Sequence, residues 1–272
     1  MIKFFRKIRQ KLLVENRFNK YLVYAIGEIV LVVIGIIIAL QINNWNEENK
    51  EKERTKSYLN NLTLDLEQDI RETKRQIRSI KYKAIFVDGI AEYFRDKRIS
   101  ELDNLEVFYE AFDYYGYRPL TWYKNTIQEL RSSGSLKSIR NDSIRLMINQ
   151  YYALTDHLDQ DYKEDHELSE IIYNKVFKII NTNYPRRKDL IDTLFLSYRK
   201  KDKSIFTKSK VFETAKQLNL ELLTEDMNDI HVYVNDLLNY KGNLNVRYKS
   251  EFPRLIKIGE TIIRLIKEEY ND

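Results

Sequence analysis

The chain has 272 residues and no cysteine, which excludes thiol catalysis, disulfide bonds and thiolate metal ligands. Its net charge is +5, but the first twenty residues alone contain seven Lys or Arg and a single Glu. The rest of the chain is therefore close to neutral, which argues against nucleic-acid binding, because that function requires a basic face on the folded part.

Residues 1–20 form a basic segment that also contains several large apolar side chains. If the segment is helical, most of these apolar side chains fall on one side of it. Such a helix would lie on the surface of a membrane that contains anionic lipid. An unstructured basic flank is equally compatible with the sequence.

Residues 21–42 form an apolar run in which Glu28 is the one charged residue. As a helix that rises ~1.5 Å per residue, the run is long enough to cross the ~30 Å hydrocarbon core of a bilayer. A cleaved signal peptide has a shorter apolar region, of ~7–15 residues, and a small-residue cleavage site that residues 39–42 do not provide. A buried core helix is disfavoured because the run is apolar on all faces. We therefore expect an uncleaved transmembrane anchor.

The residues that flank this run predict its orientation. Lys and Arg accumulate on its N-terminal side, whereas acids and bases nearly cancel on the other side. Because positive charge marks the cytoplasmic side of a span, we expect a cytoplasmic N-terminus and an extracytoplasmic position for residues 43–272. The amphipathic rings of Tyr21, Tyr24 and Trp45 fall where they would anchor the span at the headgroups.

Glu28 needs an explanation, because a carboxylate inside the hydrocarbon costs about 3 kcal/mol. Three interpretations remain open. In the first, Glu28 specifies self-association of the span, and the small residues Gly27, Gly35 and Ala39 allow two helices to approach closely. In the second, it pairs with a different membrane protein and takes part in proton movement. In the third, it reaches toward the headgroups and the local water.

The sequence after the span predicts a stalk and then a helical domain. Residues 43–56 are mostly charged or polar, which is typical of a solvated stalk, and residues 57–272 are expected to form the extracytoplasmic domain. Residues 44–94 contain no Pro, and apolar residues recur there at steps of three, four or seven. This periodicity predicts one long helix, continuous with the span and with a bend near Gly89 as an option.

The remaining elements are also predicted as helices. Ser100 and either Asn141 or Asp142 are candidate N-caps, Gly134 is a natural left-handed stop, and Pro253 is expected to kink or restart the last helix. The expected helices are 100–113, 121–133, 141–185, 190–198, 211–218 and 224–272, with a loop at 114–119. No alternating run predicts a strand, so we expect an all-α fold, an antiparallel helical bundle with long helices.

Two parts of the sequence carry a resemblance to a known family. They are Gly27-Glu28-Ile29, Leu31-Val32, Ile34-Gly35-Ile36 and residues 39–46 in the anchor, and Glu129-Leu130, Ser133-Gly134, Leu136, Ile139-Arg140-Asn141 and Tyr151-Tyr152 in the body. They resemble an uncharacterised bacterial family, a domain of unknown function in single-pass membrane proteins of Gram-negative bacteria. The resemblance implies an inner-membrane protein with a helical periplasmic domain, and it implies no activity and no catalytic residue.

Aromatic residues gather between residues 108 and 123. Such a cluster is able to line a groove for a small ligand or a peptide. The candidate groove residues are Tyr114, Tyr115, Tyr117, Trp122 and Tyr123. The alternative, which we favour, is that these large side chains serve helix packing while the Tyr hydroxyls stay in contact with water.

His157, Asp161 and Asp165 fall on one helical face, a pattern able to hold a divalent ion. We favour a solvated charged face, because the surrounding sequence is dense in charge. No glycine-rich phosphate loop, nucleophile elbow or H-E-x-x-H motif occurs. We therefore expect no enzyme, no cofactor and no metal centre.

The sequence thus favours a membrane-anchored interaction or scaffold protein that self-associates through its anchor and stalk. Its expected partners are the lipid bilayer and further copies of the same chain. The alternative is a sensory or transport-accessory module that binds a small ligand or peptide and couples to another membrane protein through Glu28.

Overall fold

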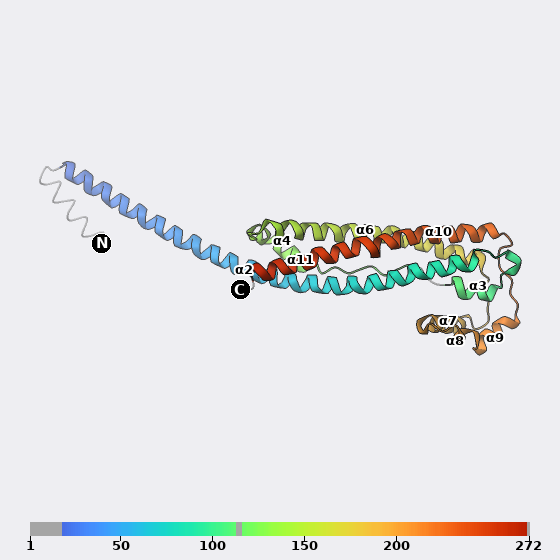
Figure 1. The fold of residues 1–272 in the computed structure, drawn as a ribbon. Helices are drawn as coiled ribbons and strands as arrows, with labels where there is room; N and C mark the ends of the chain where they lie inside the picture. The colour runs from blue at the N-terminus through green and yellow to red at the C-terminus, as the bar shows by residue number, and fades with distance from the viewer. Residues whose placement is uncertain (1–17, 113–115, 271–272) are drawn as a thin grey trace. The chain divides into compact units, whose positions relative to one another are not determined.

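The computed structural model describes residues 18–112 and 116–270, and Figure 1 shows its helices. All regular elements among these residues are helical, which confirms the predicted all-α fold class. Residues 1–17 of the predicted basic segment lie outside the described residues, and so do Tyr114 and Tyr115 of the predicted groove.

The longest helix is α2, Phe18–Phe94, which has 77 residues and contains the whole apolar run. No Pro interrupts it, so its backbone hydrogen bonds continue from turn to turn. The predicted long helix is confirmed, and it passes through Gly89 without a break. In the described part of the chain, α2 is the one helix long and apolar enough to cross a membrane. Its most apolar window has a mean hydropathy of 2.6, and none of that window is buried.

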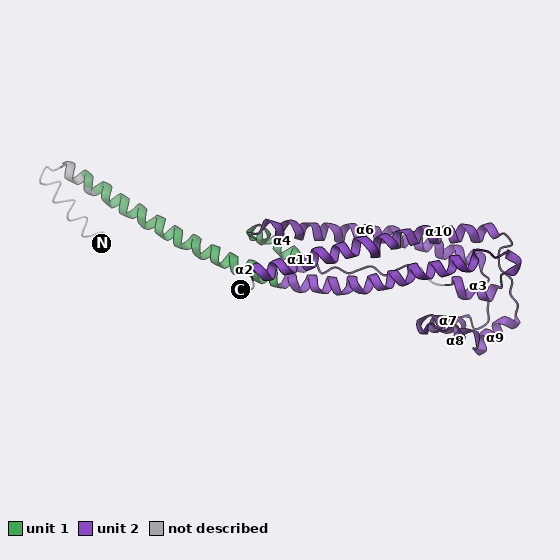
Figure 2. Cartoon of the chain, viewed as in Figure 1, with its two compact units in different colours: residues 1–60, 127–140 green, residues 61–126, 141–272 purple. Residues whose placement is uncertain are grey.

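The chain divides into two compact units, which Figure 2 shows in green and purple. Unit 1 comprises residues 1–60 and 127–140, and unit 2 comprises residues 61–126 and 141–272. The helix α2 belongs to both, because its N-terminal part lies in unit 1 and its C-terminal part in unit 2.

Unit 1 also contains most of α4 (Asn125–Ser132) and the short helix α5 (Ser135–Ser138). Gly134 ends α4 and begins α5 with a φ of +81°, the left-handed conformation that was predicted for it. The hydroxyl groups of Ser135 and Ser138 both donate hydrogen bonds to Glu51 Oε1, over 2.7 and 3.2 Å. These bonds fix the start of α5 against α2.

Three long helices join the C-terminal part of α2 in unit 2. They are α6 (Asp142–Ile179), α10 (Met227–Val246) and α11 (Phe252–Tyr270), and α6 contacts both α10 and α11. In Figure 1, α10 and α11 run back along α2 and α6 in the opposite direction. The shorter elements of this unit are the 3₁₀ turn η1 (Ile99–Glu101) and the helices α3 (Asn104–Ala111), α7 (Arg187–Lys200), α8 (Ser204–Thr207) and α9 (Lys210–Gln217).

A glycine lets α11 approach α2 and α6 closely. A Cβ atom placed on Gly259 of α11 would lie 3.1 Å from Ile70 Cδ1 and 3.1 Å from Tyr151 Cε2, which is tighter than ordinary van der Waals contact. Nearby, Lys74 of α2 and Glu260 of α11 form an ion pair of 2.9 Å. The three helices therefore share one core at this level.

Side-chain caps set two helix starts. Asn141 accepts hydrogen bonds from two backbone N–H groups in the first turn of α6, which confirms it as the N-cap. The predicted cap at Ser100 is wrong, because that residue lies within η1. Asp103 instead caps α3, where its carboxylate accepts from two backbone N–H groups.

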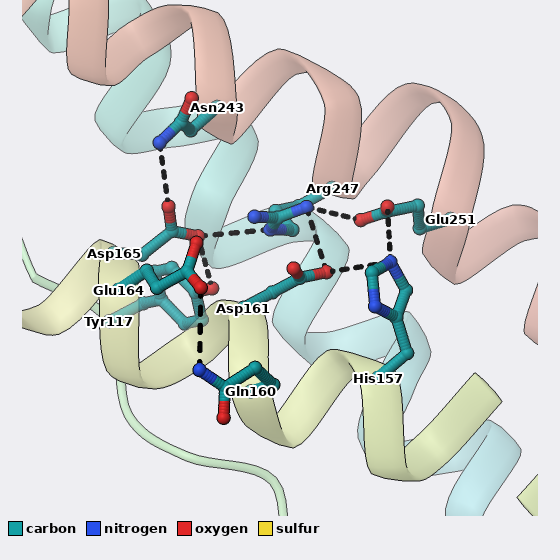
Figure 3. Close-up of polar contacts among 9 residues, drawn as sticks. All are labelled: Tyr117, His157, Gln160, Asp161, Glu164, Asp165, Asn243, Arg247 and Glu251. Atoms are coloured by element: carbon teal, nitrogen blue, oxygen red, sulfur yellow. Dashed lines mark hydrogen bonds and ion pairs between the residues drawn. The ribbon is translucent and has the colours of Figure 1, made fainter. Parts of the chain in front are cut away.

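Pro253 restarts the last helix, as predicted. After α10 ends, a π-helical turn, η2 (Arg247–Glu251), leads into α11. Proline lacks an N–H group and its ring clashes with the carbonyl four residues earlier, so a regular α-helix is unfavourable there. The wider π turn accommodates this restriction, and such turns recur at functional sites. Here it directs Arg247 and Glu251 toward α6 (Figure 3).

Candidate functional site

A cluster of charged side chains lies inside unit 2, where α6 faces α10 and η2 (Figure 3). We call it the Arg247 cluster, and its members are Tyr117, His157, Asp161, Asp165, Asn243, Arg247 and Glu251. Asp165 is fully buried. Its carboxylate accepts hydrogen bonds from the Tyr117 hydroxyl (2.7 Å), Arg247 Nε (2.9 Å) and Asn243 Nδ2 (3.0 Å). These three donors satisfy a charge that would otherwise be costly to bury.

Arg247 connects this buried anion to two further carboxylates. Its Nη1 lies 2.6 Å from Glu251 Oε2 and 3.0 Å from Asp161 Oδ2. Arg247 and Asp161 are both nearly buried, so solvent screens these contacts weakly. Three carboxylates therefore surround one guanidinium group, and the cluster carries an excess of negative charge.

Burial and charge perturb the protonation of these groups. Burial raises the pKa of Asp161, and the neighbouring Arg247 charge offsets this only in part. Burial and the Asp165 anion both raise the pKa of the Tyr117 hydroxyl, which therefore remains a hydrogen-bond donor. Burial disfavours the charged form of Arg247, but its hydrogen bond to Glu251 and the charge of Asp165 outweigh that effect and raise its pKa.

His157 lies at the solvent edge of the cluster, with 57% of its side chain exposed. Its Nε2 is 3.4 Å from Asp161 Oδ2 and 3.5 Å from Glu251 Oε1. The donor atoms of His157, Asp161 and Glu251 all lie within 4.8 Å of one another, which is close enough to share one metal ion. The edge of the cluster at His157 is therefore able to bind a cation, whereas the residues further inside form structural ion pairs.

The solvated face that the sequence favoured for His157, Asp161 and Asp165 is wrong for the two aspartates. Asp165 is 0% exposed and Asp161 is 7% exposed, and only His157 reaches water. The local sequence suggested a charged surface because the partner is distant: Arg247 comes 82 residues after Asp165. The signal that was available is Pro253, because it marked the helix restart that places Arg247 and Glu251.

A second buried carboxylate, Asp69, lies on α2 and is 1% exposed. It accepts hydrogen bonds from the backbone N–H of Tyr123 (3.0 Å) and from the Tyr151 hydroxyl (3.1 Å). Burial raises its pKa to about 6, and the charge of Asp65 adds to this, while the two hydrogen bonds and the charge of Lys124 act in the opposite direction.

The described residues of the predicted groove lie in the irregular segment 116–124. Tyr117 is buried and donates to Asp165, Trp122 Nε1 donates to Asp159 Oδ1 over 2.7 Å, and Tyr123 remains 44% exposed. Bonds of this kind hold residues 121–124 outside a helix, so α4 begins at Asn125 and not at the predicted Thr121. A ligand groove at this segment stays a prediction.

The predicted association residues all lie on α2. Gly35 and Ala39 are one helical turn apart, and a Cβ atom on Gly27 or Gly35 would meet no other atom within 4 Å. Glu28 is partly exposed on the same helix, and Trp45 is 66% exposed beyond the apolar run. Tyr21 and Tyr24 lie within the helix, but their side chains are outside what the structure describes.

The fold and the cluster define a class of protein: an all-helical chain with one long apolar N-terminal helix and a charged cluster in its body. The chain belongs to the Family of unknown function (DUF6090), whose model matches residues 28–202. This confirms the resemblance to an uncharacterised family. The matched region includes Glu28, His157 and both cluster aspartates and ends before Arg247. No curated protein and no solved structure shows significant similarity to the chain.

Removing the central cation is expected to destabilise unit 2 strongly. Arg247→Met leaves three buried or half-buried carboxylates without their positive partner, which should cost about 3–5 kcal/mol of unfolding free energy. The matched control is Arg264→Met, because Arg264 pairs with Glu268 on the exposed face of α11 and should contribute less than about 1 kcal/mol. Urea unfolding of the full chain in mild detergent measures both values. Equal losses in the two variants would contradict the central role of Arg247.

The raised pKa of Asp69 predicts a pH dependence of stability. Its pKa is about 6 in the folded protein and ~3.9 in an unfolded chain, so the folded state binds the proton more tightly. The stabilisation is complete below about pH 4 and is lost as the pH rises through about 6, which amounts to roughly 3 kcal/mol. Asp69→Asn keeps an acceptor for Tyr123 and lacks the titration. The melting temperature of Asp69→Asn minus that of the wild type should therefore increase as the pH rises from 4 to 7. A difference that stays constant over this pH range would refute the assignment to Asp69.

Proposed function

We propose that this protein is a membrane-anchored scaffold that self-associates through α2 and holds a helical domain beside the membrane. The observation that carries the proposal is the continuity of α2: one helix contains an apolar window with no buried residue and then enters the core of unit 2. A helix that the apolar window shares with the body suits a protein that tethers a body to a bilayer.

The proposed location is the inner membrane of a Gram-negative bacterium, with a cytoplasmic N-terminus and a periplasmic body. The basic residues before the apolar run support this orientation, because Lys and Arg are retained on the cytoplasmic side. The resemblance of the anchor to single-pass inner-membrane proteins supports the same location. The charged part of α2 that follows, with i,i+3 ion pairs such as Glu47–Lys50 at 3.0 Å, suits a helix in water.

The small residues in the apolar run support self-association. In lipid, helices associate through close packing and polar contacts, and Gly35-x-x-x-Ala39 is a spacing that allows backbones to approach. Glu28 lies two turns earlier and supplies a polar group whose burial between helices would lower the cost of holding it in hydrocarbon.

The association is testable by adding bulk at the small-residue face. Gly35→Leu should convert an oligomer of the full chain into a smaller species in mild detergent, because the larger side chain separates the two backbones. Ile37→Leu is the control, since it changes a large residue of the same run to another of equal size. Light scattering gives the mass of each complex.

Glu28→Ala tests whether the carboxylate contacts a second copy of this chain or a different membrane protein. Loss of the oligomer supports a contact between copies of this chain. A mass that neither Gly35→Leu nor Glu28→Ala changes would contradict self-association through the anchor. Crosslinking in native membranes that captures a different membrane protein at Glu28, and no second copy, would favour the sensory or transport-accessory alternative.

A further inference from the structure

We propose that His157, Asp161 and Glu251 bind one divalent transition-metal ion of the Zn²⁺ type at the solvent edge of the Arg247 cluster. The site is separate from the anchor and goes beyond the scaffold function proposed above. It combines one imidazole and two carboxylates, a donor set that zinc accepts in proteins.

The spacing of the three donor atoms fits a shared ion better than direct hydrogen bonds. His157 Nε2 lies 3.4 Å from Asp161 Oδ2 and 3.5 Å from Glu251 Oε1. Hydrogen bonds between nitrogen and oxygen are usually ~2.7–3.2 Å long, so both contacts exceed that range. Two donors that each lie ~2.0–2.2 Å from a zinc ion at a tetrahedral angle are separated by about 3.4 Å. The two separations from His157 therefore match those that coordination requires, and the third, between Asp161 and Glu251, is within 4.8 Å.

Asp161 supplies a second and independent indication. The residue is 7% exposed, and its Oδ2 is buried and accepts no hydrogen bond. Arg247 Nη1 lies 3.0 Å from this oxygen as an ion pair, but without hydrogen-bond geometry. A buried carboxylate oxygen without a hydrogen bond is costly unless another group compensates for the lost water. The Arg247 charge compensates for part of this loss, and Oδ2 is also the atom that faces His157, so a cation between the two side chains would add to that compensation (Figure 3).

The charge of the cluster also matches a divalent cation. Within the Arg247 cluster, Asp161, Asp165 and Glu251 are the three carboxylates, and Arg247 is the one cation apart from His157 (Figure 3). With a neutral imidazole, two negative charges remain uncompensated, which one divalent ion would neutralise. Arg247 would keep its bonds to Asp165 and to Glu251 Oε2, and it would share Asp161 Oδ2 with the ion.

The surrounding contacts orient the ligands. Arg247 holds Glu251 through Oε2 and leaves Oε1 directed toward His157. Asp161 and His157 are four residues apart, so they project from the same face of α6. Proteins usually orient a metal-binding carboxylate in this way, through a hydrogen bond to the oxygen that does not bind the metal. Because the His157 ring is exposed, an ion can enter the site from solvent on this side. Water can then occupy a remaining coordination position of the ion.

The imidazole ligand of His157 determines which class of metal ion the site prefers. Calcium and magnesium prefer oxygen ligands alone, whereas zinc and neighbouring transition metals accept nitrogen and carboxylate oxygen together. We therefore expect Zn²⁺ to bind and Mg²⁺ or Ca²⁺ to leave the site unaffected.

The experiment uses the untagged full chain in mild detergent after treatment with a chelator. Titration with ZnCl₂ in a calorimeter should give about one ion per chain and a rise in melting temperature. His157→Ala should weaken the affinity by at least about tenfold, because the site loses its nitrogen ligand. The matched control is His231→Ala, which removes an exposed imidazole from α10 and should retain wild-type affinity.

Two further measurements keep the outcome decisive. The melting temperature of the metal-free His157→Ala protein shows that it folds, and Glu251→Gln tests a carboxylate ligand without removing its bulk. Cobalt(II) in place of zinc should give the visible absorption of a four-coordinate site in the wild type and lose it in His157→Ala. The proposal is overturned if the wild type binds no zinc, if His157→Ala binds it as tightly as His231→Ala, or if Mg²⁺ gives the same response.

Discussion

The apolar surface of α2 is the constraint on which the rest of the molecule depends. Ile29, Leu31 and Ile42 each expose more than 60% of their surface, and large apolar side chains continue around the helix between them. Leaving such surface in water costs about 25 cal/mol per Å². Soluble monomers rarely expose apolar patches of more than a few hundred Å². This part of α2 is long and apolar enough to cross a membrane, and the same helix continues into unit 2.

Arg247 has the corresponding organising role inside unit 2. It bonds to Asp165 of α6, which in turn accepts from Tyr117 of the irregular segment and from Asn243 of α10. A buried ion pair adds little net stability by itself, because desolvation offsets most of the attraction. Such a network does oppose a change of register, since a shift would leave a buried charge without its partner. The charged cluster thus fixes how α6 lies against α10 and η2, and it leaves a carboxylate-rich edge beside His157.

Features of the fold that depend on local interactions were predictable from the sequence, whereas features that depend on long-range contacts were not. Helical periodicity predicted α2, and local chemistry predicted the cap at Asn141, the left-handed Gly134 and the restart at Pro253. These features depend on residues within a few positions of one another. The start of α3 was missed because Asp103 competes with Ser100 for the same N-terminus, and the backbone geometry decides between them.

The candidate site was only partly predictable for a physical reason. The residues His157, Asp161 and Asp165 were identified as a possible ion site from their spacing, but their burial depends on Arg247, which lies far along the chain. Glu251 belongs to the same edge and was not found at all, because nothing in the local sequence connects it with α6. Tyr117 was a candidate for a groove, and the favoured interpretation was packing with its hydroxyl in contact with water. The residue is buried and its hydroxyl donates to Asp165, so the expected contact with water is wrong for Tyr117. A charge-dense helix therefore does not reveal from sequence alone which of its carboxylates face solvent.

The proposed membrane anchor is tested most directly by the topology of the full chain in a Gram-negative cell. Alkaline phosphatase, which is active only after export, and a fluorescent protein, which is bright only in the cytosol, are fused in turn to the C-terminus. With a membrane anchor and a periplasmic body, we expect an active phosphatase, a dark fluorescent protein and a chain that stays in the membrane pellet after alkaline carbonate extraction. A bright fluorescent fusion, or intact chain in the soluble fraction, would contradict it.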